Sequence, residues 1–198
     1  MRILLFLLFF TAYSALSKPA QINQAITPLS SEKSLKEKVN TEKVKPHEGV
    51  HYKELQYRRG LSHLKGSDNP YTGKSYRLFS NGQKFWEGHY KDGQKEGPSV
   101  TWHRNGQKSG EIHYKDGKQD GLDIRFHENG KKRFESNWKD GKKDGSSMTW
   151  HENGIKWSEG NFKDGERDGP FVSWYDNGQK FREEHYKNGK KDGSSMTW

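Results

Sequence analysis

The chain has 198 residues, of which 28% are hydrophobic and 31% charged, and its formal net charge at pH 7 is +9. This apolar fraction is too low for a thick globular core, and the absence of cysteine excludes a disulfide framework and a cysteine nucleophile. Low hydrophobicity with high charge ordinarily indicates disorder. Aromatic residues nevertheless make up 13% of the chain and mostly recur in phase with the glycines, which favours a thin, repetitive structure.

The first residues have the pattern of an export signal. Arg2 provides a positive start, Ile3 to Phe10 is an unbroken apolar run, and Ala15-Leu16-Ser17 supplies small residues for cleavage. The run is shorter than the roughly 20 apolar residues that span a bilayer. We therefore expect a signal peptide over residues 1–17, cleaved near Ser17, and a periplasmic or extracellular protein. An uncleaved membrane anchor is the alternative.

Residues 18–60 follow as a segment rich in Lys, Glu, Ser and Gln that contains Pro19, Pro28 and Pro46. Its composition predicts a disordered, charged linker. In this segment and in the repeats that follow, acidic and basic residues alternate instead of forming a basic stripe. The positive charge thus predicts weak attraction to anionic surfaces and disfavours a nucleic-acid site.

A repeat array occupies residues 61–198. From Gly73 the chain divides into five units of 24 residues, at 73–96, 97–120, 121–144, 145–168 and 169–192, followed by part of a sixth. A fixed period of this size is typical of arrays in which each unit packs on its neighbours. The segment Gly189 to Trp198 repeats Gly141 to Trp150 letter for letter; it is either a terminal cap or the sign of an incomplete reading frame.

Each unit contains two hairpin signals, an Asn-Gly pair and an Asp-Gly pair that becomes Asn188-Gly189 in the last unit. The array is therefore predicted to be all-β, an elongated single-layer antiparallel meander with two short strands per unit. The turn glycines of the Asn-Gly pairs are Gly82, Gly106, Gly130, Gly154 and Gly178.

The loop at each Asn-Gly pair decides which face the aromatic residues occupy. A two-residue loop would place Trp102 and Tyr114 on opposite faces, whereas a three-residue loop with a left-handed glycine would place both on one face with Val100, Gly110 and Ile112. The second arrangement gathers the apolar residues and is preferred. It predicts a partner-binding face made of Trp86, Trp102, Tyr114, Phe126, Trp138, Trp150, Phe162, Trp174 and Tyr186.

The segment from Trp86 to Gly97, WEGHYKDGQKEG, resembles a MORN repeat (membrane occupation and recognition nexus). Pro70-Tyr71-Thr72-Gly73 and the recurring Asn-Gly-x-Lys make it more similar to the bacterial MORN variant, as in the YwqK family, whose members are often labelled antitoxins of toxin–antitoxin pairs. The resemblance implies an elongated, twisted single-layer sheet of consecutive hairpins. A cytoplasmic antitoxin does not fit the predicted export.

Two polar columns recur at the same period. The glutamates at 87, 111, 135, 159 and 183 and the lysines at 84, 108, 132, 156 and 180 are expected to form cross-strand charge pairs on a solvated face. The histidines at the 24-residue period are His103, His127 and His151. Each would lie two strands, or roughly 9–10 Å, from the next. Zinc ligands each sit about 2 Å from the metal, so this column does not predict a metal site.

The sequence predicts no catalytic residue and no cofactor. Ser146, Ser147 and His151 come from one turn and strand, and a single-layer sheet lacks the dry, enclosed cavity that catalysis needs. We therefore expect a non-catalytic, exported module for protein interaction or scaffolding through the aromatic face. The alternatives are an antitoxin-like protein that sequesters a toxin and a peripheral binder of anionic lipid or polysaccharide.

Overall fold

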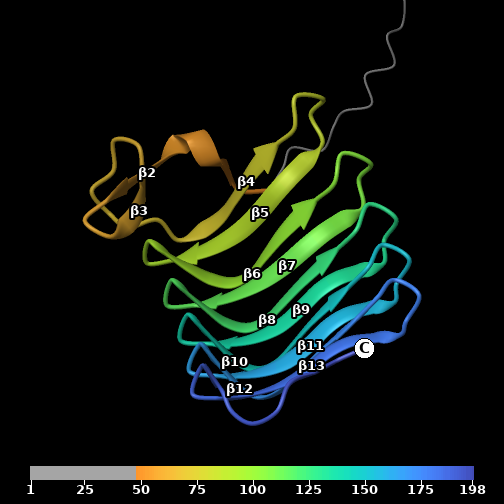
Figure 1. The fold of residues 1–198 in the computed structure, drawn as a ribbon. Helices are drawn as coiled ribbons and strands as arrows, with labels where there is room; N and C mark the ends of the chain where they lie inside the picture. Colours follow the sequence, from red (N-terminus) through yellow and green to blue (C-terminus); the bar gives the residue numbers. More distant parts are fainter. Residues whose placement is uncertain (1–47) are drawn as a thin grey trace, which may run out of the picture. The chain divides into compact units, whose positions relative to one another are not determined.

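The computed structural model describes residues 48–198, so the predicted signal peptide and most of the predicted linker lie outside the described residues. The described part is an open sheet of 13 strands with a separate two-stranded hairpin (Figure 1). Its one helical element is the 3-10 turn η1 (Tyr52–Glu54), and no helix in residues 48–198 has the length and apolarity to cross a membrane. The all-β class is confirmed.

The predicted meander is also confirmed, because β4 pairs with β5 and every strand from β5 to β13 pairs with the strands before and after it in sequence. The strands are β4 (Gly73–Leu78), β5 (Lys84–Lys91), β6 (Gln94–Trp102), β7 (Lys108–Lys115), β8 (Lys118–Phe126), β9 (Lys132–Lys139), β10 (Lys142–Trp150), β11 (Lys156–Lys163), β12 (Glu166–Trp174) and β13 (Lys180–Lys187). The short strands β14 (Lys190–Lys191) and β15 (Met196–Thr197) both pair with β13.

The two turn signals produce two different turns. At the Asn-Gly pairs, the His103 N–H donates to Gln107 O at 2.8 Å and the Gly106 N–H donates to His103 O at 3.0 Å. Gly106 has φ +83°, so the loop has three residues and a left-handed glycine, as predicted. At the other end Asp116 and Gly117 both have positive φ, +49° and +79°. A two-residue turn of this kind matches the right-handed twist of the strands.

One further residue changes the prediction for the aromatic face. Trp102 pairs with Lys108 but Thr101 pairs with Gly110, which leaves Ser109 as an extra residue. Because side chains alternate between faces, one extra residue moves the whole returning strand to the opposite face. The predicted single aromatic face is therefore wrong. Each of the five Asn-Gly hairpins has such a bulged residue, namely Phe85, Ser109, Arg133, Trp157 and Phe181.

The register defines two faces. The inner face carries the rings of Trp86, Tyr114, Trp138, Phe162 and Tyr186. These rings flank a central column that takes one residue from each strand, each paired with the residue on the next strand. The column is Ser75, Gly88, Ser99, Ile112, Asp123, Ser136, Ser147, Gly160, Phe171 and Glu184. The outer face carries Trp102, Phe126, Trp150 and Trp174.

The strands bend at the central column, so the sheet forms a trough with the inner face inside it (Figure 1). Between β5 and β6 the pairing shifts from Gly88–Ser99 to Tyr90–Lys95, which places three residues of β6 opposite one of β5. Gly97, within that stretch, has φ +73°, a conformation that glycine adopts without steric cost. Small residues of the column are buried at the bend; Ser75 is 0% and Ser136 is 1% exposed.

The predicted linker ends earlier than residue 60. β1 (Val50–His51) pairs in parallel with β4, and the His51 ring lies 5.6 Å from the Tyr76 ring. β2 (Leu55–Arg58) and β3 (Leu61–Leu64) form the separate hairpin. The prediction of disorder over residues 50–58 is therefore wrong, because Val50–His51 pairs with the edge of β4 that would otherwise be unpaired and Leu55–Arg58 pairs with β3.

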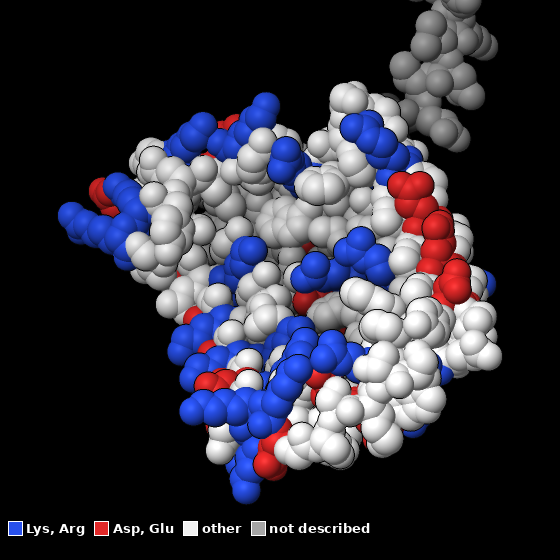
Figure 2. All heavy atoms as spheres, in the orientation of Figure 1, with Lys and Arg blue, Asp and Glu red and all other residues white. Residues whose placement is uncertain are grey.

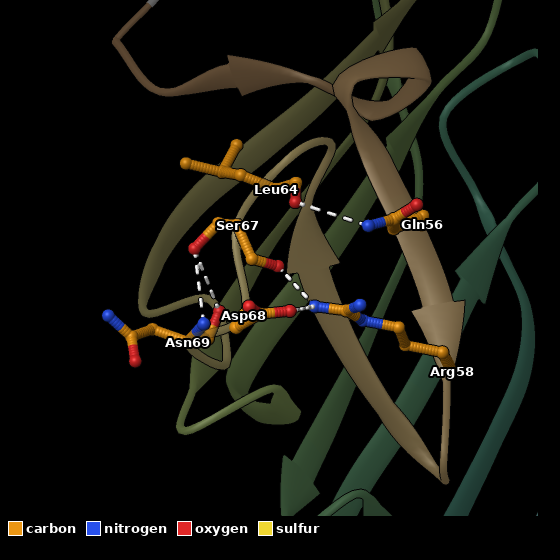
Figure 3. A network of polar contacts seen from close by, with 6 residues as sticks. All are labelled: Gln56, Arg58, Leu64, Ser67, Asp68 and Asn69. Carbon is orange, nitrogen blue, oxygen red and sulfur yellow. Dashed lines mark hydrogen bonds and ion pairs between the residues drawn. The ribbon is translucent and has the colours of Figure 1, made fainter.

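The hairpin β2–β3 is fixed to the first unit of the array. The Ser62 N–H donates to Gly93 O and the Tyr71 N–H donates to Ser62 O, both at 2.8 Å. Arg58 from β2 holds the loop that follows β3, because its Nη2 donates to Ser67 O and to Asp68 Oδ1 (Figure 3). The start of the array thus has a cap built from non-repeat sequence.

Candidate binding groove on the inner face

Hydrogen bonds that recur from unit to unit join consecutive units along both rims of the trough. At the Asn-Gly rim, Nε2 of His103, His127 and His151 donates to the carbonyl oxygens of Phe126, Trp150 and Trp174, at 3.0, 3.0 and 3.3 Å. The histidine column is therefore a structural feature that joins units. Among residues 48–198 no group of three His, Asp or Glu side chains is placed to hold a metal ion.

The Asp-Gly rim is joined in a similar way. The Asp116 N–H donates to Glu96 Oε2 at 3.0 Å, and the Gly117 N–H donates to Lys95 O at 3.0 Å. The same side-chain contact recurs from Asp140 to Asp120 at 3.2 Å. These recurring hydrogen bonds between units fix the spacing of the units. They therefore also fix the positions of the inner-face side chains relative to one another.

Two adjoining cavities lie in the trough. The first, about 650 Å³, is lined by Trp86, Tyr114 and neighbouring side chains; the second, about 640 Å³, is lined by Phe134, Trp138 and others. Both include Arg125 and Arg133, so they form one groove that crosses the strands. Each volume lies within the range of about 300–1,000 Å³ typical of ligand sites.

Lysine ammonium groups lie over the aromatic rings of this groove. Lys95 Nζ lies 4.8 Å from the Tyr114 ring centroid and 5.8 Å from that of Trp86. Lys143 Nζ lies 4.9 Å from Phe162 and 5.0 Å from Phe134. These are cation–π distances. Burial lowers the pKa of both lysines, because the charged ammonium loses hydration.

A buried ion pair sits in the floor of the groove. Asp123 is 0% exposed and accepts two hydrogen bonds from Arg125, Nε to Oδ1 at 3.0 Å and Nη2 to Oδ2 at 2.9 Å. The hydrogen bond to Asp123 raises the pKa of Arg125. The guanidinium also lies 5.4 Å from the Phe134 ring. Arg125 is therefore held in place with its Nη1 side outside the bidentate contact.

Comparison with known families identifies the repeat. The MORN repeat variant matches residues 95–116, 119–140, 143–164 and 167–188. Residues 95–188 are four consecutive MORN-variant repeats. The hairpin β4–β5, which precedes the matched ranges, has the same loop, bulge and register as the MORN hairpins and forms a fifth unit. No curated protein sequence matches the chain.

The outer face of the MORN sheet is organised differently. Lys84, Lys108, Lys132, Lys156 and Lys180 each form an ion pair with the glutamate three positions later, at 2.5 to 2.8 Å. The expected charge pairing occurs, but within a strand and not across strands, because the bulged residue between Lys and Glu brings positions i and i+3 to one face. Lys156 Nζ also lies 5.4 Å from the Trp174 ring.

The structure divides the predicted partner-binding residues. Trp86, Tyr114, Trp138, Phe162 and Tyr186 belong to the inner face, of which Trp86 and Tyr114 line the first cavity and Trp138 the second. The strand register puts Trp102, Phe126, Trp150 and Trp174 on the outer face, although Trp102, Phe126 and Trp150 also border the cavities at the Asn-Gly end.

Sequence reasoning missed the charged residues of the groove, Lys95, Asp123, Arg125 and Lys143. A signal was available in the MORN array itself. The positions equivalent to Asp123 hold Ser75, Ser99, Ser147 and Phe171, and the positions equivalent to Arg125 hold Arg77, Thr101, Thr149 and Ser173. Of the five units, one alone combines an acid and a base at these two positions on the same face of one strand, which marks a local interaction.

Proposed function

We propose that this protein with MORN-variant repeats is an exported, non-catalytic binding module whose inner-face groove receives a segment of a protein partner. The observation that carries the proposal is the pair of adjoining cavities that are lined by aromatic rings and held between two rims of recurring hydrogen bonds. Concave, mostly apolar sites with a few convergent polar groups are the usual form of a binding site. Export rests on the sequence pattern of residues 1–17.

The chemistry of the lining supports binding over catalysis. Nucleophilic catalysis needs a nucleophile within hydrogen-bond reach of a base. His127 and His151, which line the second cavity, instead donate Nε2–H to backbone carbonyls of the next unit. The lining is otherwise dominated by rings and by Lys and Arg side chains.

The two faces provide a matched test. The mature chain is used as bait in its own compartment, beside an inner-face variant, Trp138→Leu with Phe162→Leu, and an outer-face variant, Trp174→Leu with Trp198→Leu, whose residues line neither cavity. Circular dichroism checks that all three fold. A protein that binds the wild-type chain and the outer-face variant but not the inner-face variant supports the proposal. Equal capture by all three would contradict it.

The same experiment separates the alternatives. Capture of a toxin encoded beside this chain, with the bait in the cytoplasm, would replace the exported module by the antitoxin-like function. Retention on anionic vesicles or polysaccharide that disappears at high salt, without any captured protein, would replace it by surface binding.

A further inference from the structure

The lysines of the two faces differ in their counter-ions. Every one of the five periodic lysines of the outer face has a glutamate at 2.5 to 2.8 Å. Lys95 and Lys143 of the inner face have no carboxylate within ion-pair distance among residues 48–198, and the one hydrogen bond of Lys143 is a long contact of 3.5 Å to Ser147 Oγ. A partly buried ammonium without a counter-ion is unfavourable.

The other unused polar atoms of the groove are donors as well. Trp138 Nε1 is buried and has no hydrogen-bond partner in the described part of the chain. Arg125 commits Nε and Nη2 to Asp123, which leaves Nη1 outside that contact. The side of the groove that carries Lys95, Lys143 and Arg125 therefore offers unused hydrogen-bond donors and positive charge, whereas Glu128 and Glu152 lie on the opposite side. A ligand that satisfies these donors supplies acceptor oxygens with negative charge.

The aromatic rings point to the same ligand chemistry. Trp86, Tyr114, Phe134 and Phe162 each have a Lys or Arg cation over the ring, at 4.8 to 5.8 Å from the centroid. Rings covered in this way are less available to stack on nucleobases or sugar rings. They act as supports that hold the cations over the groove.

The charge of the groove is one-sided. Lys95 and Lys143 pair close to the Asp-Gly turns, whereas Glu128 and Glu152, in the Asn-Gly loops, line the opposite side of the two cavities. Figure 2 shows Lys and Arg side chains around the hollow and a column of acidic side chains along the edge formed by the Asn-Gly loops. A uniformly anionic surface or polyanion would meet repulsion at that acidic rim. A polypeptide can carry carboxylates on one side only.

From these observations we propose that the segment received by the groove is an acidic one, with Asp or Glu carboxylates bound at Lys95, Lys143 and the Arg125 Nη1 edge. This inference rests on the proposed function and names the chemistry of its partner. An extended strand places alternate side chains on opposite sides. A segment with acidic residues at alternate positions would direct all of its carboxylates toward Lys95 and Lys143. None of them would then face the acidic rim that carries Glu128 and Glu152.

The test uses a fluorescent peptide of alternating Glu and Ala, about eight residues long, which in extended form crosses β6 to β11. Its control replaces every Glu by Gln. Binding of both peptides to the full chain is measured by fluorescence anisotropy. The inner-face variant Lys95→Gln with Lys143→Gln is compared with the outer-face variant Lys108→Gln with Lys156→Gln, which removes the same charge, and circular dichroism confirms that both are folded.

We expect the Glu peptide to bind more tightly than the Gln peptide, and its Kd to rise roughly tenfold in the inner-face variant, since each charge-assisted hydrogen bond contributes that order of affinity. The outer-face variant should retain the wild-type Kd. Equal weakening in both variants would show non-specific attraction and overturn the inference, as would absence of peptide binding. If capture of a protein still depends on Trp138 and Phe162 while the Glu peptide has no advantage, the proposed function stands and the acidic segment is wrong.

Discussion

The two faces of this sheet use the same residue types for different purposes. On the outer face Lys156 lies over Trp174 and forms an ion pair with Glu159, so ring, cation and anion neutralise one another. On the inner face Lys143 lies over Phe134 and Phe162 with no carboxylate partner. The outer arrangement stabilises the fold by itself, whereas the inner arrangement leaves a partly buried ammonium without a carboxylate at ion-pair distance. This difference in counter-ions, more than the aromatic content, is the basis of the acidic partner proposed above.

The largest expected change in stability comes from adding a bulky side chain to the inner face, where the residues are closely packed, instead of the outer face. A Cβ at Gly160, in the central column, would lie 2.5 Å from Cδ2 of Phe171, whose ring is itself held 4.1 Å from the Arg167 guanidinium. Gly160→Val should therefore lower the free energy of unfolding by about 3 kcal/mol. The neighbouring change Asn161→Val, on the exposed outer face, should change it by less than about 0.5 kcal/mol. Urea unfolding of both variants tests this, and equal losses would mean that the bend is not tightly packed.

A second comparison concerns carboxylates. Asp123→Ala removes a fully buried acid that accepts two hydrogen bonds from Arg125. We expect a loss of about 2 kcal/mol, less than for a fully enclosed pair because Arg125 can turn toward solvent. Glu135→Ala on the outer face removes the partner of Lys132 and should cost only about 0.3 kcal/mol. Similar costs in denaturant titrations would show that the floor pair is no more important than the surface pairs.

Replacing one lysine on each face should give effects of opposite sign. Lys143→Met removes a charge that has no counter-ion and keeps an apolar side chain among the rings, so the free energy of unfolding should rise by up to about 1 kcal/mol. Lys156→Met removes both the ion pair with Glu159 and the contact with Trp174, and should lower it by about 0.5 kcal/mol. Thermal unfolding at neutral pH measures both. A destabilising Lys143→Met would indicate that the groove already satisfies this ammonium.

The smallest effect is a pH dependence confined to alkaline solution. Burial lowers the pKa of Lys95 and Lys143 in the folded state, whereas the unfolded value is about 10.4. Between the lowered value and about 10.4 the unfolded chain binds more protons, so these lysines make stability rise with pH. Burial raises the pKa of Tyr90 and Tyr114, which has the opposite effect above about pH 10.

The tyrosine contribution is removed by comparing the free energy of unfolding of the wild-type chain with that of a double variant, Lys95→Met with Lys143→Met, because both chains keep the tyrosines. We expect the stability advantage of this variant to shrink as the pH rises toward 10. A constant difference between the two chains across that range would contradict the lowered lysine pKa values.

Much of this fold could be predicted from the sequence because turns are local. Asn105-Gly106 and Asp116-Gly117 specify their loops through residues that adopt positive φ, and their 24-residue period sets the number and order of the strands. The functional face could not be predicted in the same way. It depends on the single extra residue at Ser109 and its equivalents, and alternation with period two converts that one residue into a change of face for a whole strand.

A ten-residue segment that occurs twice with identical sequence separates local from tertiary causes in the same way. Within Gly141 to Trp150, residues 142–150 form the nine-residue strand β10, whereas in the identical Gly189 to Trp198 only Lys190–Lys191 and Met196–Thr197 pair, both with β13. Local sequence determined the left-handed glycines of both copies, Gly141 and Gly145 and then Gly189 and Gly193. The length of the strand was decided by its neighbours, because β10 has hydrogen-bond partners on both sides, β9 and β11, and the second copy has a partner on one side only.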